Sequence, residues 1–290
     1  MSRSIAPLSE RLRAHALGDD AFAEAYQAVP AHRRAWLKTA ISRLYALYGP
    51  PEVVQESRAA MYRGGFTMRA HRRPRNSAVI FIGPGPTSPA KLLAAAVPAM
   101  VSGVVDIGVV RVGCRGNWEP AVLCAMELAG LEQGYDLAAA AAAALADELC
   151  DTQASGILLD LGSTLPNARP SLSMDYWRPA HGDRADIWLD GPGDVDLEIL
   201  EFCCPDVAFH VWGTQLDITS DVFTSREGPF EVFLGEADQV AYVPDSRIEL
   251  VQATALLSLG RGSESCWYWH DLPQRRFFQE RITLRTERLS

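Results

Sequence analysis

Residues 77–112 constrain the fold of this chain most, because they read as a strand, a helix and a second strand in close succession. The apolar run from Ala78 to Ile82 has the length and the β-branched content of a buried strand. Apolar residues recur at helical spacing from Lys91 to Ser102, and Val104 to Val112 reads as the next strand. The segment therefore predicts a βαβ unit with two parallel, buried strands.

A turn rich in glycine and proline joins the first strand to the helix. Gly83-Pro-Gly-Pro86 breaks the apolar run. Thr87 and Ser88 are good N-caps, and Pro89 suits the first helical position. The start of such a helix could accept a phosphate at its free N–H groups. Pro86 lacks an N–H group, however, and no third glycine follows at the spacing of the dinucleotide fingerprint, so a phosphate site and a purely structural turn both remain open.

The rest of the chain alternates between predicted strands and predicted helices. Short apolar runs predict strands at 157–161, 187–189, 207–212, 230–234 and 239–243. Helical patterns predict two or three helices within 8–63, among them 31–48, and further helices at 119–130, 137–149 and 247–259. This alternation predicts an α/β, Rossmann-like fold of mainly parallel sheets with flanking helices.

The predicted fold divides into three segments. Residues 1–76 would form an N-terminal helical segment, 77–185 the α/β core, and 186–290 a second α/β segment that completes the fold. The stretch 162–183 is longer than most loops in compact domains, which indicates either a functional lid or a domain connector. A charged tail covers residues 275–290.

Composition indicates a globular protein and argues against two kinds of partner. Of the 290 residues, 48% are hydrophobic and 22% are charged, and the formal net charge is -9. That charge disfavours a nucleic-acid binder, and the one dense basic run, at residues 71–75, is interpreted as a solvated connector. No window reaches the roughly 18 apolar residues of a membrane span, and the amino terminus lacks the apolar core of a secretory signal. We therefore expect a cytoplasmic protein without a membrane partner.

Few polar side chains form a pattern that predicts chemistry. The six histidines are dispersed, and His210 lies in an apolar run, where a hydrogen-bonded core histidine is the usual case. A second glycine-proline turn, 190–194, follows another predicted strand. Alternation after it would place Asp194, Asp196 and Glu198 on one strand face, either as a cation or acid–base site or as a solvated edge.

The six cysteines show no metal-binding spacing. They are Cys114, Cys124, Cys150, Cys203, Cys204 and Cys266. Their scatter through predicted strands and helices is typical of buried thiols in a protein of this size. The adjacent pair at 203 and 204 could supply a nucleophile, but the sequence places no histidine to activate it.

Several segments form a recognisable series. They are the first glycine-proline turn, Ala96-Val-Pro-Ala-Met-Val-Ser-Gly-Val104, Ala121-Val-Leu-Cys-Ala-Met-Glu-Leu-Ala-Gly-Leu131 and the alanine-rich stretch 138–146. Over residues 73–146 their order, spacing and residue types resemble the central part of histidinol dehydrogenase, within the wider aldehyde-dehydrogenase-like architecture. Weaker similarities lie in the second glycine turn and in Phe278-Gln-Glu-Arg-Ile-Thr283. The resemblance implies the α/β architecture of that family and NAD as a cofactor.

The sequence departs from that family in the segments that carry catalysis. The family oxidises an amino alcohol through an aldehyde to a carboxylate, with NAD, a zinc ion and a Glu-His acid–base pair. Its zinc ligands lie in a Ser-Gln-x-Glu-His-Gly segment, a Gly-Asp-Tyr segment and a terminal helical region. None of these is recognisable here, no Glu-His pair occurs, and the sequence ends where the last region would begin. We therefore expect a degenerate active site without zinc.

The resulting prediction is a small-molecule or nucleotide-binding protein derived from an NAD-dependent oxidoreductase. Its site would lie between the two glycine turns, at the carboxyl ends of strands. The residues expected to bind NAD or a related ligand are Gly83, Gly85, Thr87, Ser88, Lys91, Gly191, Gly193 and Asp194.

Two alternatives remain open. The first is an active NAD-linked alcohol or aldehyde oxidoreductase with altered catalytic residues, for which Cys114, Cys203 and Cys204 are candidate nucleophiles. The second is a non-catalytic partner or scaffold subunit, which seven tryptophans suggest. The expected partner is a small-molecule ligand. Both a monomer and a homodimer are compatible with the sequence.

Overall fold

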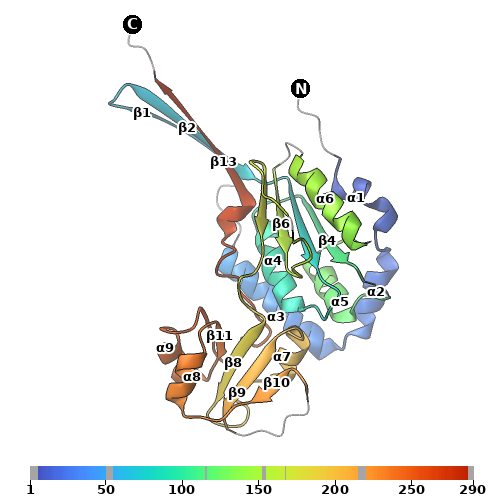
Figure 1. The fold of residues 1–290 in the computed structure, drawn as a ribbon, viewed down its shortest axis with the longest axis vertical. Helices are drawn as coiled ribbons and strands as arrows, with labels where there is room; N and C mark the ends of the chain where they lie inside the picture. Colours follow the sequence, from blue (N-terminus) through green and yellow to red (C-terminus); the bar gives the residue numbers. More distant parts are fainter. Residues whose placement is uncertain are drawn as a thin grey trace.

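The computed structural model describes residues 6–49, 55–114, 116–151, 155–166, 168–214 and 220–286. Figure 1 shows two sheets with their helices, one above the other in that view, and a narrow arm that projects from the upper part. We call the upper five-stranded sheet and its helices the first half. Residues 184–271, which hold the lower sheet, are the second half. None of the helices within the described ranges is long and apolar enough to span a lipid bilayer.

The first sheet has the strand order β5-β4-β3-β6-β7, and all its neighbouring strands are parallel. Its strands are Gly134–Leu137 (β5), Asp106–Val112 (β4), Ser77–Ile82 (β3), Gly156–Asp160 (β6) and Met174–Trp177 (β7). Helix α4, Pro89–Val101, connects β3 to β4 at the centre of the sheet. The predicted βαβ unit is therefore confirmed.

Alternation along β3 divides the core into two layers. Ala78, Ile80 and Ile82 pack with α4 and with α5 (Pro120–Ala129) in one layer, while Val79 and Phe81 pack with α6 (Ala139–Asp151) in the other. Because helices cover both faces, every residue of β3 is buried, which explains the continuous apolar run in the sequence. The helices of this half are Leu8–Arg11 (α1), Asp19–Ala28 (α2), Ala31–Tyr48 (α3), Pro120–Ala129 (α5) and Ala139–Asp151 (α6).

The second sheet repeats the parallel arrangement in the order β10-β9-β8-β11-β12. Its strands are Phe223–Ser225 (β10), Ala208–Gly213 (β9), Arg184–Leu189 (β8), Val240–Tyr242 (β11) and Leu257–Leu259 (β12). Its helices are Leu197–Cys203 (α7), Phe230–Glu236 (α8) and Ile248–Val251 (α9). The predicted α/β class with parallel sheets is confirmed in both halves.

The strand predicted at 230–234 is wrong, because these residues form helix α8. Phe230 and Phe233 lie one helical turn apart, and Phe233 is fully buried against Trp188 and Trp212. A short apolar run fits a strand and a helix equally well, and here the burial of aromatic rings at helical spacing decides between them.

The structure differs from the prediction in further places. The helix predicted at 247–259 is only the four residues of α9, and its last part is the edge strand β12. Strand β5 was not predicted at all. The stretch 162–183 holds the short strand β7 and leads from β6 of the first sheet to β8 of the second.

The projecting part is an antiparallel sheet of three strands, β1-β2-β13, at Glu56–Tyr62, Phe66–Pro74 and Phe278–Thr286. We call residues 56–74 and 278–286 the arm. The predictions of helices up to residue 63 and of a solvated connector at 71–75 are therefore wrong, and most of the charged tail is strand β13. These strands carry no continuous apolar run because most of their residues are exposed.

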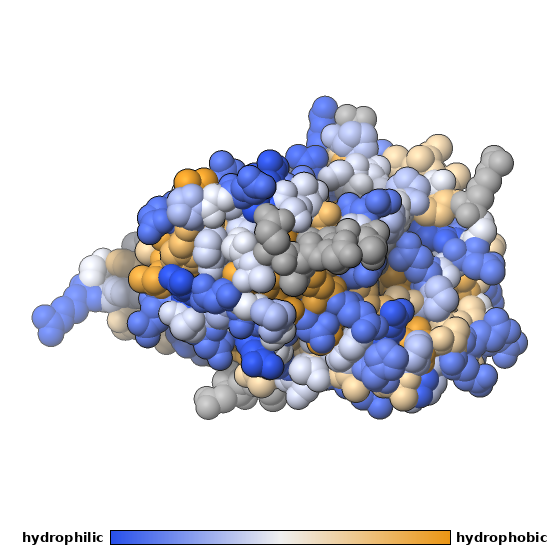
Figure 2. Space-filling model, turned by 90° about the horizontal axis from the view of Figure 1, so that it is seen from below, coloured by the Kyte–Doolittle hydropathy of each residue, from blue (hydrophilic) through white to orange (hydrophobic). Residues whose placement is uncertain are grey.

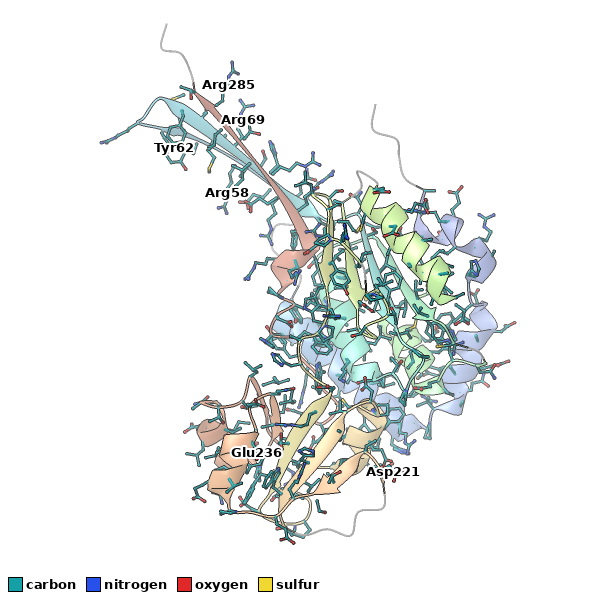
Figure 3. The ribbon with its side chains drawn as sticks, viewed as in Figure 1. Arg58, Tyr62, Arg69, Asp221, Glu236 and Arg285 are labelled. Carbon is teal, nitrogen blue, oxygen red and sulfur yellow. The ribbon has the colours of Figure 1, made fainter. Side chains whose placement is uncertain are left out.

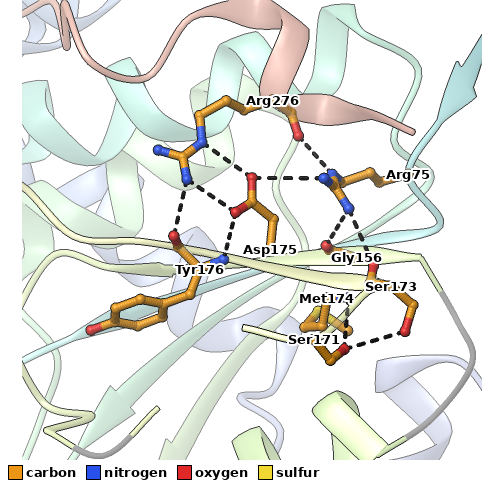
Figure 4. Close-up of polar contacts among 8 residues, drawn as sticks. All are labelled: Arg75, Gly156, Ser171, Ser173, Met174, Asp175, Tyr176 and Arg276. Carbon is orange, nitrogen blue, oxygen red and sulfur yellow. Dashed lines mark hydrogen bonds and ion pairs between the residues drawn. The ribbon is translucent and has the colours of Figure 1, made fainter. Parts of the chain in front are cut away.

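A partly buried ionic cluster fixes the base of the arm to the first sheet, as Figure 4 shows. Arg276, just before β13, donates to both oxygens of Asp175 on β7, at 3.1 and 3.0 Å. Arg75, just after β2, lies 3.7 Å from the same carboxylate and donates to the carbonyl oxygens of Gly156 and Ser173. Burial lowers the pKa of Arg75, because desolvation disfavours its charge. One carboxylate therefore binds two arginines that lie 201 residues apart in sequence.

Removing that carboxylate should destabilise the protein. We expect Asp175→Ala to lower the free energy of unfolding by about 1–3 kcal/mol, because it leaves two part-buried guanidinium groups unpaired. The matched control is Asp238→Ala, whose ion pair with Arg184 is mostly exposed and should contribute less than about 0.5 kcal/mol. Urea unfolding measures both. Equal losses in the two variants would show that the cluster does not hold the arm.

Candidate functional site

A cleft lies where the two sheets approach each other. The carboxyl ends of β3 and β6 meet the segments that lead into β8 and β9 there, and they enclose a cavity of about 340 Å³. A second hollow of about 350 Å³ lies at the carboxyl ends of β3 and β4. The turn that follows β3 lines both hollows through Gly83, Pro84, Gly85 and Thr87, so it forms the wall between them.

Close packing of two glycines positions this turn. Gly162, which follows β6, lies against the backbone of Gly83, and a Cβ atom at residue 162 would come within 2.7 Å of the Gly83 Cα atom. No side chain fits at that distance. Glycine at 162 thus allows the loops after β3 and β6 to pass each other, and this sets the shape of the cavity wall.

Ser88 joins the first half to the second half. Its side chain caps helix α4, since Ser88 Oγ accepts a hydrogen bond from the Lys91 N–H at 3.1 Å. The same hydroxyl donates to the carbonyl oxygen of Cys203, at the end of α7, at 2.6 Å. The predicted N-cap and the predicted first-turn proline, Pro89, are both confirmed.

Lys91 is the cation of the cavity. Its Nζ lies 3.2 Å from Oδ2 of Asp206 and 5.1 Å from the centre of the Trp267 ring. Only 10% of the Lys91 side chain is exposed, against 29% of that of Asp206. Burial raises the pKa of Asp206, and the ammonium group beside it partly offsets that rise. The pair gives the cavity wall two charges held in a fixed position.

The helix start offers few free groups to a phosphate. Pro89 has no N–H group, and the N–H of Lys91 is bound to Ser88. Among the first three helical residues, only Ala90 therefore has an N–H group that does not already bind the Ser88 side chain. The N–H of Thr87 already donates to Oε2 of Glu119 at 3.4 Å. An anion in this cavity would depend mainly on the Lys91 side chain.

The second hollow is lined by polar groups that already have partners. Arg111 makes a two-point contact with Asp136, at 2.6 and 3.1 Å, and Trp118 donates to the same carboxylate. Burial raises the pKa of Glu119, which lines this hollow, and it also raises the pKa of the Cys114 thiol. Neither the guanidinium nor the thiol is thus poised as an activated group.

The structure does not bring the two predicted glycine turns together. Gly83, Gly85, Thr87, Ser88 and Lys91 line the cavity. Gly191, Gly193 and Asp194 do not, because they follow the carboxyl end of β8 whereas the cavity lies at its amino end. Six strand residues, about 20 Å, separate the two ends. The expectation of one site between the turns is therefore wrong in its geometry.

The second turn has a structural arrangement of its own. Asp194 accepts a hydrogen bond from the N–H of Gly191 through Oδ2 at 2.6 Å, and Asp196 caps helix α7 through the N–H groups of Glu198 and Ile199. The predicted strand face of three acidic residues is therefore wrong. Because Leu197–Cys203 is helical, these carboxylates do not alternate across a strand.

The remaining polar candidates lie outside the cavity or are buried. His210 on β9 faces the buried Asp186 at 3.5 Å, and burial is the main cause that lowers the pKa of this histidine. Cys203 and Cys204 are buried, and burial raises the pKa of both thiols. Among the described residues, no three His, Cys, Asp or Glu side chains gather in a way that could hold a metal ion.

Sequence reasoning missed three residues that shape the cavity. Gly162 packs on the turn, Asp206 pairs with Lys91, and Trp269 donates from Nε1 to the Lys91 carbonyl oxygen at 3.1 Å. No local pattern marks any of them, since each lies at least 70 residues from the turn in sequence. The one available indication of such residues was Lys91, a lysine within an apolar helix, because a buried charge requires a partner.

Comparisons with known proteins agree with this architecture. Residues 7–149 match the family model of histidinol dehydrogenase. A solved histidinol dehydrogenase from Elizabethkingia anophelis has a TM-score of 0.61 at 14% identity, and the match covers 94% of this chain and 77% of that chain. An NAD-dependent benzaldehyde dehydrogenase from Corynebacterium glutamicum gives a lower TM-score of 0.47 at 12% identity, and the match covers 93% of this chain and 87% of that chain. No curated protein matches the sequence.

The fold and the cleft define the class of the protein as an α/β protein with two parallel sheets and a dehydrogenase-type fold. More particularly, residues 7–149 are similar to histidinol dehydrogenase, and the fold of the chain is like that of a solved member of that family. The resemblance seen over residues 73–146 is therefore confirmed, and it points to an origin among dehydrogenases.

The contact between the two glycines gives a direct test of the cavity wall. Gly162→Ala should lower the free energy of unfolding by about 1–3 kcal/mol, because its methyl group would overlap the backbone of Gly83. In Gly85→Ala, the added methyl group meets nothing within 4 Å, so this control should change stability by less than about 0.5 kcal/mol. Thermal unfolding compares the two. A Gly162 variant as stable as the control would contradict the packing.

Proposed function

We propose that this protein binds a small molecule or a nucleotide in the cleft between its two sheets, and that it derives from an NAD-dependent dehydrogenase. The observation that carries the proposal is the cavity of about 340 Å³ at the carboxyl ends of β3 and β6, with the Lys91–Asp206 pair in its wall. Open α/β sheets bind ligands at this edge, and cavities of this size hold small ligands.

The lining supports a ligand with a polar or anionic group next to a flat ring. Lys91 is a fixed cation, the hydroxyls of Thr87 and Ser163 line the same cavity, and Trp269 provides an aromatic surface. The cavity lies at the lower end of the volumes typical of ligand sites, so a nucleotide or small metabolite suits it. A dinucleotide such as NAD would need the second hollow as well, across the turn at 83–87.

We also propose that the redox chemistry of the family has been lost. The sequence has no Glu-His pair, and the segments that carry the zinc ligands in that family are not recognisable in it. The described His, Cys, Asp and Glu side chains do not form a metal-binding set, so no step of the proposal passes through zinc. A cytoplasmic location is part of the proposal, and six free cysteines support it.

The alternative of a cysteine-based oxidoreductase has less support. A nucleophilic cysteine acts as the thiolate, which a raised pKa disfavours at neutral pH. Burial raises the pKa of Cys114, and it does the same for Cys203 and Cys204. Only Cys114 among these three lines one of the hollows.

The two lysines of the chain allow a test of the proposed site, because Lys91 lines the cavity and Lys38 does not. A thermal-shift screen with NAD, mononucleotides and imidazole compounds should find a ligand that raises the melting temperature, because ligands of the native state stabilise it. Lys91→Met should weaken that ligand at least about tenfold, as loss of a charged contact implies. Lys38→Met removes an exposed lysine on α3 and should leave binding unchanged. Equal affinity in both variants would move the site elsewhere.

A turnover assay separates the binder from the enzyme. With NAD and a panel of alcohols and aldehydes, we expect no change in absorbance at the nicotinamide band beyond the rate without protein. Should turnover appear, Cys114→Ser would identify the residue responsible if it abolished the rate, because Cys114 is the candidate thiol that lines a hollow. Measurable turnover in the unaltered protein would overturn the proposed loss of chemistry.

A further inference from the structure

Helix α4 buries a single charge, that of Lys91. Every residue from Pro89 to Ala99 is buried, and only 10% of the Lys91 side chain is exposed. An apolar side chain at this position would be at least as stable, because the desolvation of an ammonium and a carboxylate often outweighs their attraction. The stability of the helix therefore does not explain the lysine. Its place in the wall of the cavity points to a chemical role instead.

The surroundings of the Lys91 amino group suit a nucleophile. Its Nζ lies 3.2 Å from Oδ2 of Asp206, which is within reach for proton transfer. Burial raises the pKa of Asp206, so this carboxylate accepts a proton more readily than an exposed aspartate does. A lysine that has such an acceptor beside it can react as an amine.

The rest of the cavity wall suits a ligand with hydroxyl groups. Four lining residues carry side chains that can hydrogen-bond to an alcohol, namely Thr87, Ser163, His181 and Asp183. Trp269 adds a flat apolar surface to the same wall. A molecule with several hydroxyls can therefore replace, inside the cavity, the hydrogen bonds that it loses on leaving water.

The charge around the cavity disfavours a phosphorylated ligand. Its lining carries one ammonium, that of Lys91, and two carboxylates, those of Asp183 and Asp206. The second half, which supplies Asp206, contains 17 aspartates and glutamates against four arginines and no lysine, a formal charge of -13. Figure 2 looks at the lower end of the molecule, where this half lies, and shows hydrophilic residues over much of its surface.

The basic residues of the chain do not offset this charge at the cleft. Figure 3 places Arg58, Arg69 and Arg285 on the arm, at the opposite end of the structure from Asp221 and Glu236. All residues outside the arm and the second half together carry a formal charge of only -1. An excess of carboxylates lowers the local concentration of anions. An uncharged ligand therefore fits the cleft better than a phosphate ester.

We propose that Lys91 forms a reversible imine with a small polyhydroxylated aldehyde or ketone bound in the cavity. The inference rests on the proposed function, because it takes the same cavity and names the class of its small-molecule ligand. The hydroxyl-binding side chains and the single, already paired ammonium favour such a molecule over nucleotides. Imine formation transfers no hydride, so the step needs no redox cofactor.

The atoms and charges of this step balance within the cavity. Asp206 takes one proton from the Lys91 ammonium, the amine attacks the carbonyl carbon, and a second proton moves from nitrogen to the carbonyl oxygen. Asp206 then returns its proton to the new hydroxyl, the C–O bond breaks, and water leaves. The product is an iminium ion with the charge of the former ammonium. Its pairing with Asp206 and its contact with the Trp267 ring, 5.1 Å from Nζ, therefore persist.

The two lysines of the chain make the test direct. The unaltered protein is incubated with glyceraldehyde and sodium cyanoborohydride, which reduces an imine to a stable secondary amine, and peptide mass spectrometry locates the adducts. Lys91 should be modified at least about tenfold faster than Lys38, because a bound carbonyl compound meets the amine at a high effective concentration. Accessibility alone predicts the opposite order, since Lys38 is exposed and Lys91 is buried. Faster modification of Lys38 would overturn the proposal.

Related compounds test the ligand class, with Lys38 as the internal reference for intrinsic reactivity. The ratio of the Lys91 rate to the Lys38 rate should fall about tenfold for propanal, which lacks the hydroxyls. It should also fall for glyceraldehyde 3-phosphate, which brings negative charge to a cavity that already has two carboxylates. Equal ratios for all three compounds would overturn the assignment of an unphosphorylated, hydroxylated ligand.

Thermal unfolding separates this inference from the proposed function. A compound that raises the melting temperature through Lys91 but forms no adduct there would overturn the imine and leave the binding site standing. If no compound of the screen shifts the melting temperature and no adduct forms at Lys91, both proposals fail. Lys91→Met should abolish the fast adduct, whereas Lys38→Met should leave it unchanged. The rate ratio is measured in the unaltered protein, so the test holds even if a variant does not fold.

Discussion

The structure depends on the burial of helix α4 on every side. All residues from Pro89 to Ala99 are buried, and Lys91 is the only charged residue of the helix. A helix without a polar face must be covered all round, so the first sheet takes one side while outer helices and the second half take the other. The two sheets are therefore held around one helix, and the cleft is the space left at its amino-terminal end. The single charge in that helix explains why Asp206 comes from the second half to meet it.

The sequence predicted the parts of the fold in which local pattern and burial agree. Strand β3, helix α4 and strand β4 were found because both faces of the sheet are covered, which leaves an unmistakable apolar run. The arm was missed for the opposite reason. Its strands are mostly exposed, so Glu56–Tyr62 shows no apolar period. Strand β13, which pairs with β2, lies about 200 residues further along the chain. Pairing over such a distance cannot be read from local sequence.

Only one of the two predicted glycine turns lies at the cavity. Five of the eight proposed residues line the cavity, because a turn after a central parallel strand always lies at the carboxyl edge of its sheet. The turn at 191–194 was grouped with them by analogy of residue type, but the second sheet presents its amino edge to the cleft instead. The direction of one sheet relative to another is a property of tertiary structure. Nothing in the sequence of Gly191 or Asp194 encodes it.

The arm has a consequence for the order in which the protein folds. Strand β2 is made early in synthesis, but its neighbour β13 is made after both sheets, so β2 has only the hairpin partner β1 until the chain is almost complete. Closing a loop of this length carries a large entropy cost, and contacts so distant in sequence form slowly. The ion pairs from Arg276 to Asp175 can form only at that stage. The arm is thus a late-folding element, and an incompletely made or trimmed chain would expose the edge of β2, an unpaired strand edge of the kind that promotes aggregation.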